Sequence, residues 1–252
     1  MRKLLWLLIL APILAHGQIL APIFQKAPGT AVVTDSCTGG LVFSWHAENT
    51  DVTLGGVAGG VNNGCSVGDT TATAVGASLG TTYVKDGTYS VTSAGYNKNY
   101  TFTVSTEDLI NHTAGTIDTW VYVTSFGSGA EIVSTIVDGS NYIRVRQETV
   151  STEQHFRIAH DAGGTVRAAG DTITGGFSLN TWYHIIAKWD YTAHGGNYLQ
   201  ICANTTTGTT NCGVNTNALG TWAGTISTLN VGGVSSTATE YVDNVKVYSS
   251  WQ

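Results

Sequence analysis

Residues 180–190 read Asn-Thr-Trp-Tyr-His-Ile-Ile-Ala-Lys-Trp-Asp and carry the clearest strand pattern in the chain. Side chains alternate between the two faces of a β-strand, so every second residue shares a face. One face of this stretch holds Tyr183, Ile185, Ala187 and Trp189. The other holds Trp182, His184, Ile186 and Lys188. A strand with one apolar face and one mixed aromatic and basic face is typical of an antiparallel sheet that covers a core.

Similar runs follow one another along the chain, separated by turns rich in Gly, Asn, Asp and Ser. We expect strands at Leu41–His46, Thr88–Ser93, Tyr100–Val104, Thr116–Thr124, Glu131–Val137, Asn141–Glu148, Gln154–His160, Thr181–Asp190, Asn197–Ala203, Ile226–Val231 and Tyr241–Tyr248. No long segment has the 3.6-residue apolar period of an amphipathic helix. The pattern predicts an all-β protein whose two antiparallel sheets pack as a single sandwich domain.

The composition agrees with this fold class. The 252 residues include 38 Thr and 31 Gly, and only 11% are charged, against about 25% in a typical domain. Thr, Val and the aromatic residues favour strands over helices, which argues against a helical bundle. A hydrophobic content of 42% is enough to build a core, which excludes charge-rich intrinsic disorder.

The N-terminus resembles an export signal. Arg2 and Lys3 precede the apolar run Leu4–Leu14, and Ala15-His16-Gly17 forms a small-x-small cleavage site. The run is too short to span a bilayer as a helix. We therefore predict a signal peptide at residues 1–17, a leader at 18–36 and the domain at 37–252. The mature protein is expected outside the cell or on its surface, without a membrane anchor, and the short signal suggests a bacterial source.

The four cysteines suggest two disulfides, because the chain is predicted to be exported. A hairpin over Ala203–Asn211, with Gly208 in a left-handed turn position, would place Cys202 opposite Cys212. Cys37 and Cys65 are then left to pair with each other. The spacing fits neither a zinc site nor a redox Cys-x-x-Cys motif.

Four motifs in order resemble those of laminin-G-like, concanavalin-A-like jelly rolls. They are the Gly-Thr-Ile-Asp-Thr-Trp-Val run at 115–121, the stretch 180–190, Leu-Asn-Val-Gly-Gly at 229–233 and Tyr-Val-Asp-Asn-Val-Lys-Val-Tyr at 241–248. The resemblance implies a two-sheet jelly roll of a kind used to bind extracellular carbohydrates or proteins. The same fold also carries glycanases and lyases, so it does not settle the function.

Strand alternation predicts a candidate binding face. If the strands concerned are neighbours in one sheet, its outer face would collect aromatic and basic side chains, namely Trp120, Tyr122, Tyr142, Arg144, Arg146, His155, Arg157, Trp182, His184 and Lys188. Rings could stack on sugars and arginines could hold carboxylates or sulfates, so an acidic glycan is one possible ligand. The alternative interpretation is that the arginines pair with Glu148 or Glu153 and that the tryptophans belong to the core.

Non-catalytic recognition of an extracellular glycan or surface ligand is the favoured function, because catalytic motifs are missing. A retaining glucanase needs carboxylates that alternate on one strand, whereas Glu240 and Asp243 have odd spacing and fall on opposite faces. A polysaccharide lyase acting on a uronate polymer is the catalytic alternative, with His155 or Tyr142 as base. A third possibility is a structural subunit of a surface filament that self-assembles through Gln18–Lys26.

The remaining predictions concern a metal and nucleic acid. Glu48, Asp51 and Asp243 could meet near the first and last strands and hold a structural calcium ion. The alternative for Asp243 is that it accepts hydrogen bonds from the backbone of a loop. A net charge of −6 disfavours nucleic acid as a partner, since phosphate binding needs clustered Lys and Arg.

Overall fold

A computed structural model of the chain describes residues 40–45, 47, 52–53, 56–57, 71–103, 110–191, 198–220, 222–233 and 238–252. These residues all belong to one compact unit, Val32–Gln252. The predicted signal peptide, the leader, the Cys37–Cys65 pair and two predicted calcium ligands, Glu48 and Asp51, lie outside the described residues. Within the described ranges no helix is long and apolar enough to cross a membrane.

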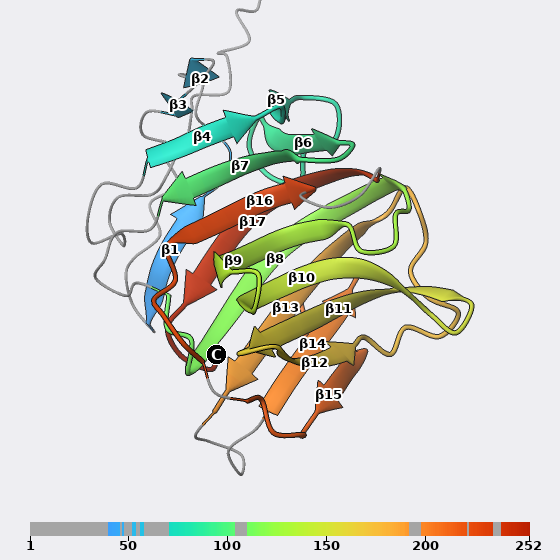
Figure 1. The fold of residues 1–252 in the computed structure, drawn as a ribbon. Coiled ribbons are helices and arrows are strands. Elements are labelled where there is room, and N and C mark those ends of the chain that lie inside the picture. Colours follow the sequence, from blue (N-terminus) through green and yellow to red (C-terminus); the bar gives the residue numbers. More distant parts are fainter. Residues whose placement is uncertain are drawn as a thin grey trace, which may run out of the picture. The chain divides into compact units, whose positions relative to one another are not determined.

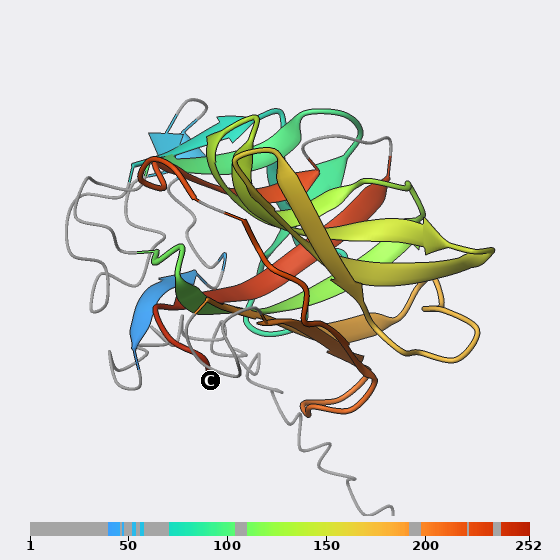
Figure 2. The ribbon, with the colours of Figure 1, turned by 60° about the horizontal axis from the view of Figure 1, so that its bottom comes forward.

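Two antiparallel sheets form the domain, as predicted (Figures 1 and 2). The eight-stranded sheet runs in the order β15 (Cys212–Asn215), β14 (Tyr198–Asn204), β13 (Trp182–Asp190), β8 (Ala114–Ser125), β17 (Thr239–Tyr248), β6 (Ser90–Ala94) and β5 (Ser78–Gly80), with β1 (Leu41–Trp45) also paired to β17. The nine-stranded sheet runs β12 (Thr165–Gly170), β11 (Glu153–Ala162), β10 (Asn141–Val150), β9 (Glu131–Asp138), β16 (Thr228–Gly233), β7 (Lys98–Thr103), β4 (Thr71–Val75), β3 (Gly56–Val57) and β2 (Val52–Thr53).

The core lies between the two sheets and contains the side chains that alternation assigned to it. From the eight-stranded sheet come Ile117, Val121, Val123, Tyr183, Ile185, Ala187 and Trp189, all buried. The nine-stranded sheet contributes Ile143, Val145, Phe156 and Ile158, which have no exposed surface. Trp45 meets Phe102 edge-on, with ring centroids 4.9 Å apart, so aromatic packing also ties β1 to β7.

One side of the sandwich is closed where β15 meets β12. The Gly213 backbone lies directly against the Gly170 carbonyl, which leaves no room for a side chain at position 213. Asn215 Nδ2 also donates a hydrogen bond to the Ala168 carbonyl at 2.9 Å. The edge strands of the two sheets therefore cover each other, which protects edges that would otherwise be free to pair with another chain.

The Cys202–Cys212 disulfide is confirmed, and it joins directly opposite residues of β14 and β15 with their Cα atoms 4.0 Å apart. Gly208 in the turn has a positive φ of 158°, a conformation that L side chains rarely adopt. Asn211, with a φ of 51°, is a second left-handed residue in this turn. Asn tolerates that conformation because its short side chain can bond locally. Here its Nδ2 donates to the Ala203 carbonyl at 3.2 Å.

Candidate functional site

The predicted binding face is divided between the two sheets. Trp120, Tyr122, Trp182, His184 and Lys188 lie on β8 and β13 of the eight-stranded sheet. Tyr142, Arg144, Arg146, His155 and Arg157 lie on β10 and β11 of the nine-stranded sheet. The prediction that all ten share one surface was therefore wrong. Each pair of strands is adjacent within its own sheet, but the outer faces of the two sheets point away from each other across the core.

The arginines of the nine-stranded sheet are occupied by carboxylates. Glu148 binds both Arg146 and Arg157, each at 2.8 Å. Arg144 binds buried Glu131 at 3.1 Å, and its guanidinium lies 3.6 Å from the centre of the Tyr142 ring. This arrangement matches the alternative interpretation, in which outward arginines pair with glutamates, and Glu148 is the partner that it named. These arginines are not preorganised to hold an acidic ligand.

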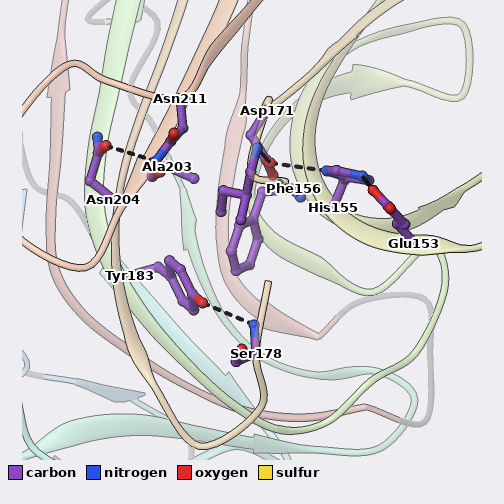
Figure 3. Close-up of polar contacts among 10 residues, drawn as sticks. Glu153, His155, Phe156, Asp171, Ser178, Tyr183, Ala203, Asn204 and Asn211 are labelled. Carbon is purple, nitrogen blue, oxygen red and sulfur yellow. Dashed lines mark hydrogen bonds and ion pairs between the residues drawn. The ribbon is translucent and has the colours of Figure 1, made fainter. Parts of the chain in front are cut away.

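His155 is also held within the protein (Figure 3). Its Nδ1 lies 3.0 Å from Asp171 Oδ1 and its Nε2 lies 3.3 Å from Glu153 Oε2. Asp171 in turn accepts hydrogen bonds from the backbone N–H groups of Phe156 at 2.6 Å and Ile173 at 2.9 Å. Both imidazole nitrogens therefore already face carboxylates, and His155 orders this loop instead of presenting a free base to a substrate.

Tyr142 is equally unsuited to act as a base. It is buried, and burial raises its pKa above the ordinary value of 10 despite the nearby Arg144 charge. A tyrosine that abstracts a proton at neutral pH needs its pKa shifted the other way. Neither residue proposed for lyase chemistry has the environment that this chemistry requires.

The outer surface of the eight-stranded sheet carries a row of aromatic rings. Trp182, Tyr122 and Tyr241 are direct cross-strand neighbours on β13, β8 and β17. The Tyr122 ring centroid lies 5.5 Å from that of Trp182 and 6.2 Å from that of Tyr241. All three side chains are partly exposed. Adjacent strands are joined in register, so the row follows from the pairing of β8 with both of its neighbours.

A segment that links β5 to β6 adds a fourth ring to this row. Tyr83 stacks on Tyr122 with centroids 4.4 Å apart and meets Tyr241 edge-on at 4.8 Å. Ser90 Oγ donates a hydrogen bond to the Tyr83 carbonyl at 2.5 Å, which helps to hold the segment in place. We call the surface formed by Trp182, Tyr122, Tyr241, Tyr83 and the neighbouring Trp120 the aromatic face.

Trp120 begins a second row on this surface, with His184 on one side and Asp243 on the other. Its ring stacks on His184 with centroids 4.9 Å apart, and Lys85 Nζ lies over the ring, 3.7 Å from its centre. His184 Nε2 contacts Asp118 Oδ1 at 2.7 Å. Trp120 and His184 are nearly buried by these contacts, so they support the exposed row more than they offer surface themselves.

Asp243 anchors the segment that covers Trp120. Its Oδ2 accepts hydrogen bonds from the backbone N–H groups of Lys85 at 2.9 Å and Asp86 at 3.1 Å. Alternation alone places Asp243 on the face of Val245 and Val247, but the pairing with β8 shifts register between Asp243 and Lys246. Asn244 at this bulge has a φ of 51°, so Asp243 points outward while the two valines are buried.

Asp243 therefore fits the alternative interpretation, in which it accepts hydrogen bonds from the backbone of a loop. Its carboxylate faces N–H donors, whereas a calcium site needs oxygen ligands. No cluster of three or more His, Cys, Asp or Glu side chains suited to a metal occurs in the part of the chain that the structure describes. Since Glu48 and Asp51 lie outside that part, the calcium site stays a prediction.

Lys188 does not contribute to the aromatic face, although the sequence predicted it there. It is buried, its Nζ donates a hydrogen bond to the Gln252 carbonyl, and it lies 5.1 Å from the centre of the Trp251 ring. Burial lowers its pKa. Lys188 thus fastens the C-terminal residues to the sheet.

Sequence reasoning missed Tyr241, Tyr83 and Lys85. Alternation along β17 places Tyr241, like Asp243, on the face of Val245 and Val247. Only the bulge at Asn244 turns Tyr241 outward. The other two lie between strands, where no periodic signal exists. Only their contacts with β8 reveal that they belong to this surface.

No protein-family model matches the chain, and no curated protein matches it in sequence. Solved structures match it in fold. The botulinum neurotoxin serotype D binding domain superposes with a TM-score of 0.57 at 10% identity, covering 84% of this chain and 48% of that one. The serotype D ligand binding domain in complex with N-acetylneuraminic acid gives a TM-score of 0.57 at 8% identity, with the same coverage, 84% and 48%.

A third matching structure, in which the matching domain itself is shorter, is domain 4 of AbnA, an extracellular arabinanase from Geobacillus stearothermophilus, in complex with arabinotriose. Its TM-score is 0.57 at 13% identity, covering 82% of this chain and 91% of that one. The chain shares a β-sandwich fold with these domains. It spans about half the length of the neurotoxin domains, and at such low identity the likeness shows the fold alone. The more specific resemblance to laminin-G-like domains, inferred from the sequence motifs, stays a prediction.

Proposed function

We propose that this protein is an extracellular, non-catalytic carbohydrate-binding module that holds a glycan on the aromatic face. The observation that carries the proposal is the cross-strand row of Trp182, Tyr122 and Tyr241, three partly exposed rings on adjacent strands. Contiguous exposed aromatic surface on a rigid sheet is typical of a ligand site. Aromatic rings provide a flat apolar surface for the C–H faces of sugars, while Tyr hydroxyl and Trp N–H groups can bond to sugar hydroxyls.

The comparisons support the carbohydrate class of ligand. The matching structures include domains in complex with N-acetylneuraminic acid and with arabinotriose, and both domains share the sandwich fold of this chain. An extracellular location is consistent with the predicted export signal and with the Cys202–Cys212 disulfide, which forms in oxidising compartments. No observation on the described residues favours the lyase. The filament alternative depends on the leader, which lies outside them.

The proposal is tested by measuring glycan binding to Trp182→Ala and Tyr241→Ala on a glycan array and by calorimetry. We expect each variant to bind at least about tenfold more weakly, which corresponds to about 1.4 kcal/mol, a reasonable contribution for one stacking ring. Tyr96→Ala is the matched control, because Tyr96 is 63% exposed in the turn between β6 and β7 and belongs to neither row of the aromatic face.

The double variant Arg144→Ala/Arg157→Ala tests the other sheet and should bind as the wild type does. Equal binding by Trp182→Ala, Tyr241→Ala and the wild type, with all proteins folded by circular dichroism, would refute the proposed face. Loss of binding in the arginine variant alone would move the site to the nine-stranded sheet. Incubation with uronate polymers should produce no absorbance from new double bonds, and an increase would establish the lyase instead.

A further inference from the structure

The carboxylates of Asp118 and Asp243, which lie beside the aromatic rings, are already satisfied within the protein. Asp118 contacts His184 at 2.7 Å, and both carboxylate oxygens of Asp243 accept backbone N–H groups, from Lys85, Asp86 and Asn244. Lys188 of the same sheet is buried away from these rings and donates to a main-chain carbonyl. Each of these charges has a structural partner that a ligand would have to displace, and breaking such a pair costs free energy that binding must offset.

No described residue of this surface is an arginine, the side chain best suited to hold a carboxylate or sulfate bidentately. Every described arginine lies on the nine-stranded sheet: Arg144, Arg146 and Arg157 on β10 and β11, and Arg167 on β12. The first three bind glutamates, and Arg167 donates to the Ala218 carbonyl at 2.9 Å. An acidic sugar stacked on Trp182 or Tyr241 would therefore find no guanidinium among the described residues of that sheet.

Lys85 is the exposed cation nearest to the rings, but its position does not create a positive surface. Its Nζ lies over the Trp120 ring at 3.7 Å. The next residue, Asp86, is also exposed, so the same short segment carries a charge of each sign. The net charge of the whole chain is −6, which adds a weak long-range repulsion toward polyanions.

The polar groups of the rings themselves suit a neutral ligand. Tyr hydroxyls donate and accept hydrogen bonds, and the Trp182 indole N–H donates, which matches the hydroxyls of an uncharged sugar. Strands in a sheet lie about 4.8 Å apart, so rings on β13, β8 and β17 extend over roughly 10 Å. A surface of that length can contact more than one sugar unit.

We infer that the aromatic face binds a neutral oligosaccharide or polysaccharide chain, rather than an acidic sugar. This inference rests on the proposed function, because it assigns the ligand class of the same surface. It replaces the acidic ligand suggested by the sequence, since that suggestion depended on arginines that the structure places on the other sheet.

The experiment compares neutral oligosaccharides derived from arabinan, xylan, galactan and β-glucan with uronate oligosaccharides and sialyllactose. Binding to the wild type, Trp182→Ala and Lys85→Met is measured by calorimetry in low and high salt. We expect a neutral glycan to bind, with an affinity that changes less than about twofold between 20 and 300 mM NaCl, because neutral contacts are not screened. Lys85→Met should stay within about threefold of the wild type, whereas Trp182→Ala should lose about tenfold or more.

Binding confined to acidic glycans, or a tenfold loss with added salt or in Lys85→Met, would overturn the inference. If Trp182→Ala also loses the binding of acidic glycans, the aromatic face is a glycan site as proposed, but its ligand is not neutral. If no glycan of either class binds to the folded wild type, the proposed function falls together with the inference.

Discussion

Gln147 Nε2 donates a hydrogen bond to Glu240 Oε2 at 2.6 Å across the interior of the sandwich. Gln147 belongs to β10 of the nine-stranded sheet and Glu240 to β17 of the eight-stranded sheet, and neither side chain is exposed to solvent. Burial raises the pKa of Glu240 from 4.5 to about 8, while the bond from Gln147 partly opposes the rise. An ionisable group therefore links the two sheets within the core.

We predict that the stability of this domain falls as the pH rises from about 5 to 8 because of Glu240. The folded state favours the protonated acid, so its contribution is complete below pH 4.5 and is lost as the pH passes through 8. The slope is at most about 1.4 kcal/mol per pH unit. Glu240→Gln cannot ionise and should show a flatter profile in urea unfolding at several pH values. Identical profiles for the variant and the wild type would contradict the prediction.

His160 should make the stability of the domain fall as the pH is lowered, the opposite of the effect of Glu240. It is fully buried and its Nε2 lies 3.0 Å from Tyr191 Oη. Burial, helped by nearby His112, lowers its pKa from 6.5 to about 4. A lowered pKa means that stability is complete above pH 6.5 and is lost as the pH falls toward 4. His160→Gln should lose less stability between pH 7 and 4 than the wild type does. Equal losses, measured by thermal unfolding, would argue against this role for His160.

Gly115 should not tolerate a side chain. A methyl group at this position would overlap the six-membered ring of Trp189, which is fully buried in the core. Gly115→Ala should therefore destabilise the domain by about 1–3 kcal/mol, as overpacked cores commonly do. Gly139→Ala is the control, because a methyl group there meets no atom within 4 Å. Chemical denaturation of the two variants should separate them clearly, and similar stabilities would show that Trp189 can move aside.

The Cys202–Cys212 bridge should contribute about 2–3 kcal/mol, as expected for a short closed loop. The two residues are separated by 10 positions in the sequence. The double variant Cys202→Ala/Cys212→Ala should unfold at correspondingly lower denaturant concentration while keeping the same strands by circular dichroism. This variant is preferable to a reductant, which would also act on the predicted Cys37–Cys65 pair. An unchanged midpoint would mean that packing alone holds the hairpin.

The sequence predicted the secondary structure and the inner and outer faces of most strands. All eleven expected strands have counterparts in the structure, and the residues assigned to the core on β8, β10, β11 and β13 are buried. These predictions succeed because strand alternation is a local property, repeated every two residues. The short strands β2, β3, β4, β5, β12 and β15 are missing from the expected list. In β4 and β12, Thr, Ala and Gly residues give little apolar contrast.

The composition of the binding surface depended on tertiary structure. Which strands become neighbours is decided by contacts between residues far apart in the chain, and the sequence carries no local signal for it. This is why Arg144 and Trp182 were grouped on one face, although they lie on different sheets. The bulge at Asn244 likewise reversed the side on which Asp243 was expected. Alternation determined which side of most strands faces the core, and sheet pairing decided which outward side chains meet.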